Sequence, residues 1–514
     1  MTPLPLIALA PLPLLAMAIA CAARPGRRPG RQPVLAEGAA LVTLILSLGG
    51  LVQLWVAGPL TLSVAGVSLL RLDAVSATMA LLVGFIGWIV VRYARRYLDG
   101  EAREGRFHAL TLATIAAVLV LVQAASLPVL IAGFVATGLI LRQLLLFYPE
   151  RAEAQRAAKK FIRVWGAGDL ALIAAALLLW RSLGTTDIAA LNATAALPGM
   201  AQVGVGLLAL GAMLKTAAFP VHGWLTEVME APTPVSALLH AGIVNAGGVM
   251  LIALAGLVQA SPGAMAALVV VGGFTALFGA LVMLTQSAIK TALAWSTVAQ
   301  MGFMLLQCGL GLWPLALLHI VAHSLYKAHA FLSAGGAVRA VNAIRKPGPV
   351  AVPGLRAVVQ SFALALLLYA VVAAGFGSLV GEKSPQAIAL GAILVFGVSY
   401  LIAQGLADQA PGALTRRTVA ASLATTLAYF GFQVAAQVIW GAGLPPAPDA
   451  GALEWALIVL ALWSFGSAAL AQSLFPHWSH HPAAAGLRVH LANGLYLNAV
   501  LDRLTGSFRT PTQS

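Results

Sequence analysis

Long apolar segments recur along this chain, and each is about as long as a membrane-spanning helix. Each is a continuous run of roughly 20 residues, which an α-helix needs to cross a bilayer, and not the short polar–apolar alternation of a membrane β-strand. The segments lie near residues 3–23, 34–56, 72–94, 107–125, 127–147, 161–181, 200–219, 234–258, 264–285, 290–311, 313–337, 355–380, 386–406, 417–440 and 453–475. The pattern predicts an all-α polytopic membrane protein with about fifteen transmembrane helices.

The composition excludes a soluble globular protein. Hydrophobic residues make up 60% of the 514 residues, charged residues make up 9%, and the mean hydropathy is +0.92. In soluble domains about 25% of the residues are charged. Cys21 and Cys308 both fall in predicted spans, and the tail histidines His477, His480 and His481 have no partners at metal-ligand spacing, so we expect no metal site in this chain.

The net charge of +14 is distributed according to topology. With the N-terminus outside, basic residues gather in alternate loops, as they do on the cytoplasmic side of membrane proteins. The first three groups are Arg24, Arg27, Arg28 and Arg31; Arg92, Arg95, Arg96, Arg103 and Arg106; and Arg151, Arg156, Lys159, Lys160 and Arg163. An odd number of spans then places the C-terminus in the cytoplasm. The basic excess therefore indicates the lipid bilayer as a partner, and no nucleic acid.

Lys215 stands inside the apolar run GVGLLALGAMLKTAAFP. A lysine near the centre of a membrane helix costs about 2.5 to 3.5 kcal/mol, so it is retained where it faces a hydrated or paired interior. Phe219 and Pro220 break the helix just downstream, and Pro232–Pro234 break the chain again. Broken helices at membrane depth border protein or water-filled cavities, where transporters place their ion sites. We therefore expect Lys215 to lie on an ion pathway.

A second group of ionisable residues lies in LALLHIVAHSLYKAHAFLSAGG. His319, His323 and Lys327 recur every four residues, which places them on one face of a helix. Such a stripe can pass protons directly or through water, although neutral histidines bonded to nearby carbonyls are an alternative for any one of them. His240 follows the Pro-Thr-Pro break and extends the set.

Three carboxylates are candidate partners of Lys215, namely Asp169, Glu227 and Glu230. A neighbouring anion would lower the cost of burying the ammonium and influence its proton affinity. Glu227 and Glu230 are equally consistent with a hydrated helix end at the interface. Lys290 opens the next apolar segment, either on the pathway or as an interfacial anchor.

Three segments carry a specific resemblance: KTAAFPVHGWLTEVMEAPTPVSALLHAGIVNAGG, IKTALAWSTVAQMGFMLL and HIVAHSLYKAHAFLSAGG. They resemble the hallmark segments of the antiporter-like family, which includes large proton-pumping membrane subunits of respiratory complex I and Mrp-type sodium/proton antiporters. The resemblance matches Lys215 to the lysine of the broken seventh helix, and His240 to a position in the eighth. It matches Lys290 to the start of the tenth helix, and His323 with Lys327 to the relay of the eleventh.

The resemblance also implies a domain organisation. The family fold has two inverted repeats of five helices that contain broken helices. The repeats correspond here to residues 107–258 and 259–410, with N-terminal transmembrane helices in 1–106. C-terminal transmembrane helices occupy 411–476, and a cytoplasmic tail occupies 477–514.

Two positions depart from the pumping members of the family. Their fifth helix carries a Trp-Glu pair whose glutamate partners the seventh-helix lysine, whereas this chain has Phe134 and Val135. Their second broken helix carries a lysine, whereas this chain has Leu379 in AAGFGSLVGEK. A half-channel has therefore lost its usual end groups, and Glu382 and Lys383 lie just beyond Leu379.

Length, the HAGIVNAGG variant and the short tail resemble the membrane subunit of the DabAB-type inorganic-carbon accumulation complexes of the bacterial inner membrane. This resemblance implies a large cytoplasmic partner, similar to carbonic anhydrase, which holds the zinc and hydrates CO2 to bicarbonate. The present chain would conduct protons or sodium and would itself be no enzyme. Two alternatives are a proton-pumping subunit of a respiratory or hydrogenase complex, and a stand-alone cation/proton antiporter.

Overall fold

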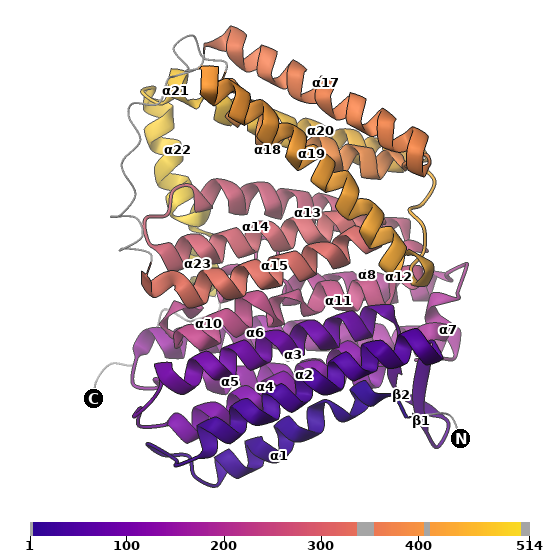
Figure 1. Ribbon diagram of the computed structural model, residues 1–514, viewed down its shortest axis with the longest axis vertical. Helices are drawn as coiled ribbons and strands as arrows, with labels where there is room; N and C mark the ends of the chain where they lie inside the picture. The colour runs from indigo at the N-terminus through magenta and orange to yellow at the C-terminus, as the bar shows by residue number, and fades with distance from the viewer. Residues whose placement is uncertain (1–3, 337–353, 406–411, 505–514) are drawn as a thin grey trace.

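The computed structural model describes residues 4–336, 354–405 and 412–504. The ends of the second predicted repeat and of the predicted tail, at 406–411 and 505–514, and the loop 337–353 lie outside the described residues. In the described part, eleven helices are long and apolar enough to cross a membrane, and three shorter apolar helices accompany them. The long helices run side by side in one bundle (Figure 1). The all-α polytopic fold class is confirmed, whereas the expected number of about fifteen spans is not.

The N-terminal part of the bundle contains six helices and a hairpin. The helices are α1 (Pro11–Ala22), α2 (Gln32–Ala57), α3 (Ala74–Tyr97), α4 (Glu104–Gln123), α5 (Leu127–Leu145) and α6 (Ala152–Leu183). Strands β1 (Leu60–Val64) and β2 (Val67–Leu72) pair antiparallel at one end of the helices, where we expected no strand. Asp73 begins α3 as a capping box, because it accepts the Ser76 N–H (2.7 Å) while its own N–H donates to the Ser76 hydroxyl (2.8 Å).

The middle of the chain is a series of short helices: α7 (Ile188–Asn192), α8 (Gly199–Lys215), α9 (Gly223–Thr226), α10 (Thr233–Ala241), α11 (Ala246–Ala253) and α12 (Ala255–Gln259). The break after α8 falls at Lys215, slightly before the expected Phe219, and Ala217 just beyond it adopts a left-handed conformation (φ 54°). The helix α10 begins at Thr233, as the Pro-Thr-Pro sequence predicts. A further break, which we did not predict, lies at Gly242 between α10 and α11.

The later helices are α13 (Pro262–Met283), α14 (Ile289–Gly309), α15 (Trp313–Ser333), α17 (Leu355–Val380), α18 (Pro385–Gly405), α19 (Gly412–Trp440) and α20 (Ala452–Ser473). The helices α13 and α14 approach closely through glycines, because a Cβ on Gly272 would lie 2.6 Å from the Leu306 nitrogen. The helices α17 to α20 form the upper part of Figure 1 and contact the rest mainly through α13 and α15. The broken helix that the family resemblance implies near Leu379 is not present, since α17 is continuous and Leu379 is 85% exposed.

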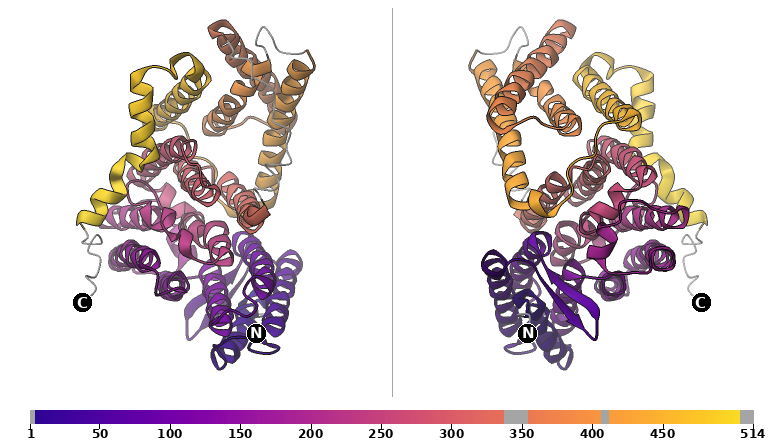
Figure 2. Two further views of the ribbon diagram at one scale, coloured as in Figure 1. Left: turned by 90° about the vertical axis from the view of Figure 1, so that its left-hand side faces the viewer. Right: turned by 90° about the vertical axis from the view of Figure 1, so that its right-hand side faces the viewer.

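The chain after α20 folds back along one end of the bundle. It forms α21 (Phe475–Trp478), α22 (Pro482–Ala492) and α23 (Leu497–Leu504). We call residues 482–504 the C-terminal strap; Figure 2 shows it, in yellow, along the flank of the molecule. Gln286 donates to the Ala492 carbonyl (3.3 Å), and a Cβ on Gly494 would lie 3.3 Å from the Trp295 ring. This part of the predicted tail is thus packed against the helices.

Candidate ion-translocation site

Lys215 ends α8 and forms a buried ion pair with α6. Its ammonium donates to Asp169 Oδ1 at 2.5 Å and to the Trp165 carbonyl at 2.9 Å. The Lys215 side chain is completely buried, and that of Asp169 is 14% exposed. Of the three candidate carboxylates, Asp169 is therefore the one that partners Lys215. Trp165 and Asp169 are four residues apart, so one face of α6 supplies both acceptors.

The space around the ammonium is shaped by aromatic rings and by one glycine. The Lys215 nitrogen lies 4.1 Å from the centre of the Trp165 ring and 5.2 Å from that of Phe134, distances at which a cation is attracted to an aromatic face. Phe134 occupies the position where the family resemblance implies tryptophan, next to Val135 in place of the glutamate. In this chain the anion beside the lysine therefore comes from α6 and not from α5. Gly168 leaves room for the lysine stem, because a Cβ there would lie 2.9 Å from Lys215 Cε.

The backbone groups exposed by the break after Lys215 find partners in the protein. The Trp224 indole N–H donates to the Leu214 carbonyl (3.2 Å), and the Phe219 N–H donates to the Thr275 hydroxyl (3.0 Å). A helix end inside a membrane protein needs such partners, since unpaired backbone groups are costly away from water. The break is therefore a stable feature that presents Lys215 at the end of α8.

The second part of the site joins α10, α14 and α15 around His240. The His240 ring is completely buried, stacks on Phe331 at 4.4 Å between centroids, and places Nδ1 3.2 Å from the Thr297 hydroxyl of α14. His323 Nε2 donates to the His240 carbonyl (3.2 Å). Because the carbonyl can only accept, Nε2 of His323 carries a proton in this arrangement. The two predicted histidines are thus in direct contact.

The predicted stripe on α15 is present. The rings of His319 and His323 are 6.0 Å apart between centroids, and His319 Nδ1 lies 2.8 Å from the Gln307 amide oxygen. Lys327 is completely buried, donates to the Leu293 carbonyl (3.0 Å), and has no carboxylate partner among the described residues. His329 is exposed, away from this buried face.

The remaining candidates lie elsewhere. Glu230 pairs with Arg151 (3.1 Å) where both side chains are more than 40% exposed, and Glu227 pairs with Lys160 (2.5 Å). Neither glutamate pairs with Lys215. Lys290 is partly exposed in the first turn of α14, and its side chain forms no hydrogen bond or ion pair with the described residues.

Several polar residues of the site were missed in the sequence analysis. Thr297 and Gln307 lie in the apolar segment 290–311, where a polar side chain among apolar residues was the available signal. Thr297 contacts His240 of α10, and Gln307 contacts His319 of α15. Lys160 was grouped with the basic loop residues, although its side chain is only 9% exposed. Nothing in the local sequence pointed to Asp502, which reaches Lys160 from the end of the chain.

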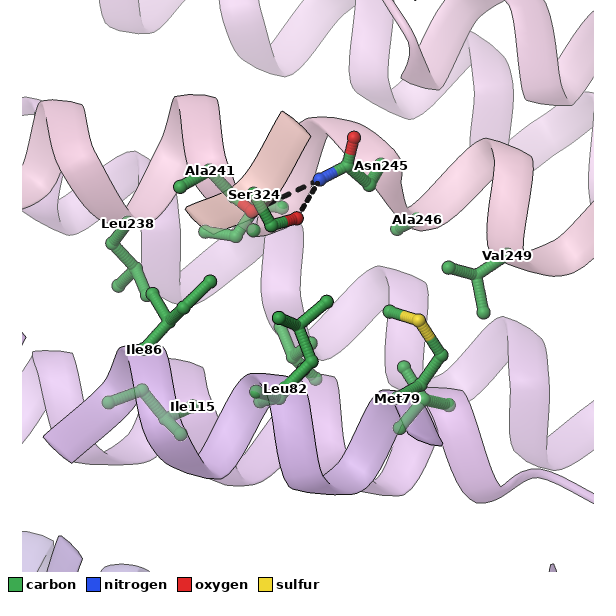
Figure 3. A pocket seen from close by; sticks show the side chains of 15 residues that line it. Met79, Leu82, Ile86, Ile115, Leu238, Ala241, Asn245, Ala246, Val249 and Ser324 are labelled. Carbon is green, nitrogen blue, oxygen red and sulfur yellow. Dashed lines mark hydrogen bonds between the residues drawn. The ribbon is translucent and has the colours of Figure 1, made fainter. Parts of the chain in front are cut away.

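A small cavity lies beside the break between α10 and α11 (Figure 3). Its volume is about 20 Å³, enough for one water molecule, and Met79 and Leu82 of α3 contribute to its apolar wall. At its polar edge the Asn245 amide donates to the Ser324 hydroxyl (2.9 Å) and to the Ala241 carbonyl (3.1 Å). Asn245 thereby ties the broken segment to α15.

The close fit of Gly168 against Lys215 gives a first testable prediction. We expect Gly168→Ala to displace the lysine stem and to lower gradient-driven transport about tenfold, equivalent to about 1.4 kcal/mol. Gly166→Ala is the matched control on the same helix, because a Cβ there would meet nothing within 4 Å. Transport in membrane vesicles, normalised to protein by immunoblot, measures both variants. Equal rates for the two would show that the fit at Gly168 is unimportant.

The fold and the site define a class of protein: a polytopic antiporter-like membrane subunit with a buried lysine–aspartate ion pair at a broken helix. The family model described as "NADH:quinone oxidoreductase/Mrp antiporter, TM" matches residues 124–381, and that described as "NADH-Ubiquinone oxidoreductase (complex I), chain 5 N-terminus" matches residues 61–108. The chain belongs to this antiporter-like family and, within it, groups with DabB-type subunits of inorganic carbon transporters.

The similarity to curated relatives extends over most of the chain. A probable inorganic carbon transporter subunit DabB2 of Halothiobacillus neapolitanus is 35% identical over 86% of this chain and 82% of that protein. A probable inorganic carbon transporter subunit DabB of Hydrogenovibrio crunogenus is 42% identical, over 59% of each chain. NADH-quinone oxidoreductase subunit L of Mycobacterium tuberculosis is 31% identical over 86% of this chain and 70% of that protein.

The fold also matches that of one chain in a solved membrane complex. A chain in the structure of the Mrp complex from Dietzia sp. has a TM-score of 0.61 and 24% identity, and the match covers 99% of this chain and 60% of that one. The relatives are subunits of multisubunit assemblies. Among the described residues no group of three or more His, Cys, Asp or Glu side chains is placed to hold a metal ion, and the expectation of no metal stays a prediction.

Proposed function

We propose that this chain conducts protons across the bacterial inner membrane and couples their inward flow to inorganic carbon uptake by a cytoplasmic partner. The observation that carries the proposal is the Lys215–Asp169 pair, an ion pair buried at the end of a broken membrane helix. Buried ionisable groups in membrane helices are expensive and mark ion pathways. Similarity to DabB subunits supplies the substrate class.

The proposed pathway has two parts on helices that contact one another. Lys215 lies on α8, which packs against α11, and α11 contacts α15, the helix of His323 and Lys327. Imidazole and amine groups exchange protons readily and are poor ligands for sodium, which favours protons as the coupling ion. Lys215 and His240 lie in the first proposed repeat, 107–258, and His323 and Lys327 lie in the second, 259–410.

The proposed orientation places the N-terminus outside and the C-terminus in the cytoplasm. The first turn of the chain, Leu6–Leu9, contacts the hairpin strand β2, and α23 lies at the opposite end of the bundle (Figure 1). Opposite ends are what an odd number of crossings requires. The basic first turns of α6 lie beside α23, since Lys160 pairs with Asp502, and this supports an excess of positive residues on the proposed cytoplasmic side.

The proposed partner is a large cytoplasmic subunit, similar to carbonic anhydrase, that binds the zinc and hydrates CO2. The present chain would then contribute energy and no hydration chemistry. One elementary charge crossing about 100 mV supplies about 2.3 kcal/mol. That free energy displaces an equilibrium about fifty-fold. A single proton per cycle is therefore enough to drive hydration in one direction.

Partner dependence gives the second prediction, which tests the proposal directly. We expect the chain expressed alone to support neither carbon uptake nor sustained cation/proton exchange in everted vesicles, because an open leak would discharge the membrane. Co-expression with the natural partner should restore bicarbonate accumulation, and an uncoupler should abolish it. Robust exchange by the chain alone would favour a stand-alone antiporter, and quinone-dependent or hydrogenase subunits in the purified assembly would favour a redox pump. Carbon accumulation that resists the uncoupler would exclude energy coupling.

A further inference from the structure

The C-terminal strap docks on the segment that follows the first broken helix. Asn498 of α23 packs on Gly223, the first residue of α9, so closely that a Cβ on Gly223 would overlap the Asn498 amide oxygen. The Asn498 amide also reaches the Thr226 hydroxyl at 3.5 Å. Together with the contacts at Ala492 and Gly494, this close fit holds α23 across the end of α6 and α9.

The strap brings a carboxylate to a lysine that already has one. Lys160 of α6 lies 2.5 Å from Glu227 Oε1 and 2.8 Å from Asp502 Oδ1. The Lys160 side chain is 9% exposed, that of Asp502 18% and that of Glu227 31%. Three segments that are far apart in the sequence therefore meet in one ionic cluster, which we call the strap cluster: Lys160, Glu227 and Asp502.

Lys160 of the strap cluster lies on α6, the helix that also contributes Asp169 to the ion pair with Lys215. Trp165 and Asp169 follow Lys160 on α6 by five and nine residues, so Asp169 lies about 13 Å further along the helix axis. Between Lys215 and the cluster along the chain stands His222, which is completely buried and whose two ring nitrogens have no hydrogen-bond partner among the described residues. A buried imidazole without a protein partner is a place where a bound water molecule can satisfy the ring nitrogens.

We propose that the strap cluster is the cytoplasmic access point of the part of the proton pathway that contains Lys215, and that Asp502 is a positioning residue that sets how readily Glu227 exchanges protons. The inference rests on the proposed proton conduction and adds the place of access and the part played by the strap. Glu227 is the most exposed member, so it exchanges protons with water. Asp502 shares Lys160 with Glu227, so Lys160 cannot neutralise Glu227 completely.

The charges around Glu227 determine the direction of the effect. Burial raises the pKa of Glu227, Lys160 and Arg156 of α6 lower it, and Asp502 of α23 raises it. Removal of the Asp502 charge should therefore lower the pKa of Glu227. If Glu227 must be protonated to pass a proton inward, the transport rate should then begin to fall at a lower pH than in the wild type.

The test compares Asp502→Asn with Asp502→Glu in the complex with its natural partner, reconstituted into vesicles. We expect Asp502→Asn to slow gradient-driven carbon uptake about fivefold at neutral pH, equivalent to about 1 kcal/mol, and to move the alkaline fall of the rate to lower pH. Asp502→Glu should keep both properties near wild type. Asp99→Asn is the matched control, because Asp99 makes an exposed ion pair with Arg28 (3.8 Å).

Infrared spectroscopy separates this inference from the proposed function. The carboxyl band that Glu227→Gln removes should titrate at lower pH in Asp502→Asn, whether or not the vesicles take up carbon. An unchanged band titration in an intact Asp502→Asn complex would overturn the inference, even if Lys215 proves essential. Loss of assembled protein in both Asp502 variants, with a wild-type pH profile in what remains, would likewise overturn it by assigning Asp502 a structural role alone. Absence of gradient-driven uptake in the wild type would contradict the proposed function only.

Discussion

Replacement of Lys215 by alanine is expected to abolish gradient-driven carbon uptake while the chain still assembles with its partner. The rate should fall at least about 100-fold, because the variant loses the buried proton-exchanging group at the end of α8. Assembly should persist because Asp169, whose side chain is 14% exposed, can take up a proton and become neutral once the ammonium is gone. Growth in air without added CO2, with protein quantified by immunoblot, measures the effect.

The matched control for this variant is Lys159→Ala. Lys159 is an exposed lysine on α6, the helix that contributes Asp169, so its loss removes the same charge without touching the pair. A double variant, Lys215→Ala with Asp169→Asn, should assemble as well as the wild type and should also fail to transport. Uptake at the wild-type rate in a well-expressed Lys215→Ala strain would exclude a pathway through this pair.

Lys327→Ala should abolish coupling through the second part of the pathway. Lys327 is completely buried, its ammonium donates a hydrogen bond to the Leu293 carbonyl, and it pairs with no carboxylate among the described residues. His323→Ala should weaken uptake about tenfold and change its pH dependence, because the variant loses an imidazole that contacts the His240 carbonyl and can exchange protons along the stripe. Both variants are measured as gradient-driven uptake at several pH values.

His329→Ala is the matched control for the α15 variants. His329 lies on the same helix, two residues from Lys327, but its side chain is exposed and turned from the buried stripe. It should keep nearly the wild-type rate and pH profile. If His329→Ala were more damaging than His323→Ala, the geometry proposed for the stripe on α15 would be wrong.

The lysine pair shows how far sequence reasoning reached into the site. Lys215 stood out because an ammonium in an apolar helix is costly, and a lysine within an apolar segment can be recognised from the sequence alone. Three carboxylates were candidate partners, and their order along the chain did not rank them. Asp169 was selected by the packing of α6 on α8, where Gly168 allows the lysine to reach both Asp169 and the Trp165 carbonyl.

The α15 stripe was better predicted because it depends on helical periodicity alone. Residues four apart share a face of any helix, so His319, His323 and Lys327 could be grouped before the fold was known. What they touch was not predictable in the same way. Thr297 and Gln307 come from α14, and the bond from His323 to the carbonyl of His240 requires the break at Gly242 and the approach of α10 to α15.

The sequence by itself determined the membrane class, the helical architecture and the ionisable residues that mark a pathway. Each of these follows from a local property of the sequence. The length of the apolar segments indicates membrane helices, the free-energy penalty of a buried charge marks the ionisable residues, and the helical repeat places them on one face. Only the tertiary structure decided that α17 is unbroken, that Asp169 partners Lys215, and that Asp502 joins Lys160 and Glu227. The two ion pairs, Lys215–Asp169 and Lys160–Asp502, join residues 46 and 342 positions apart. Their formation depends on how whole helices pack, which no local pattern records.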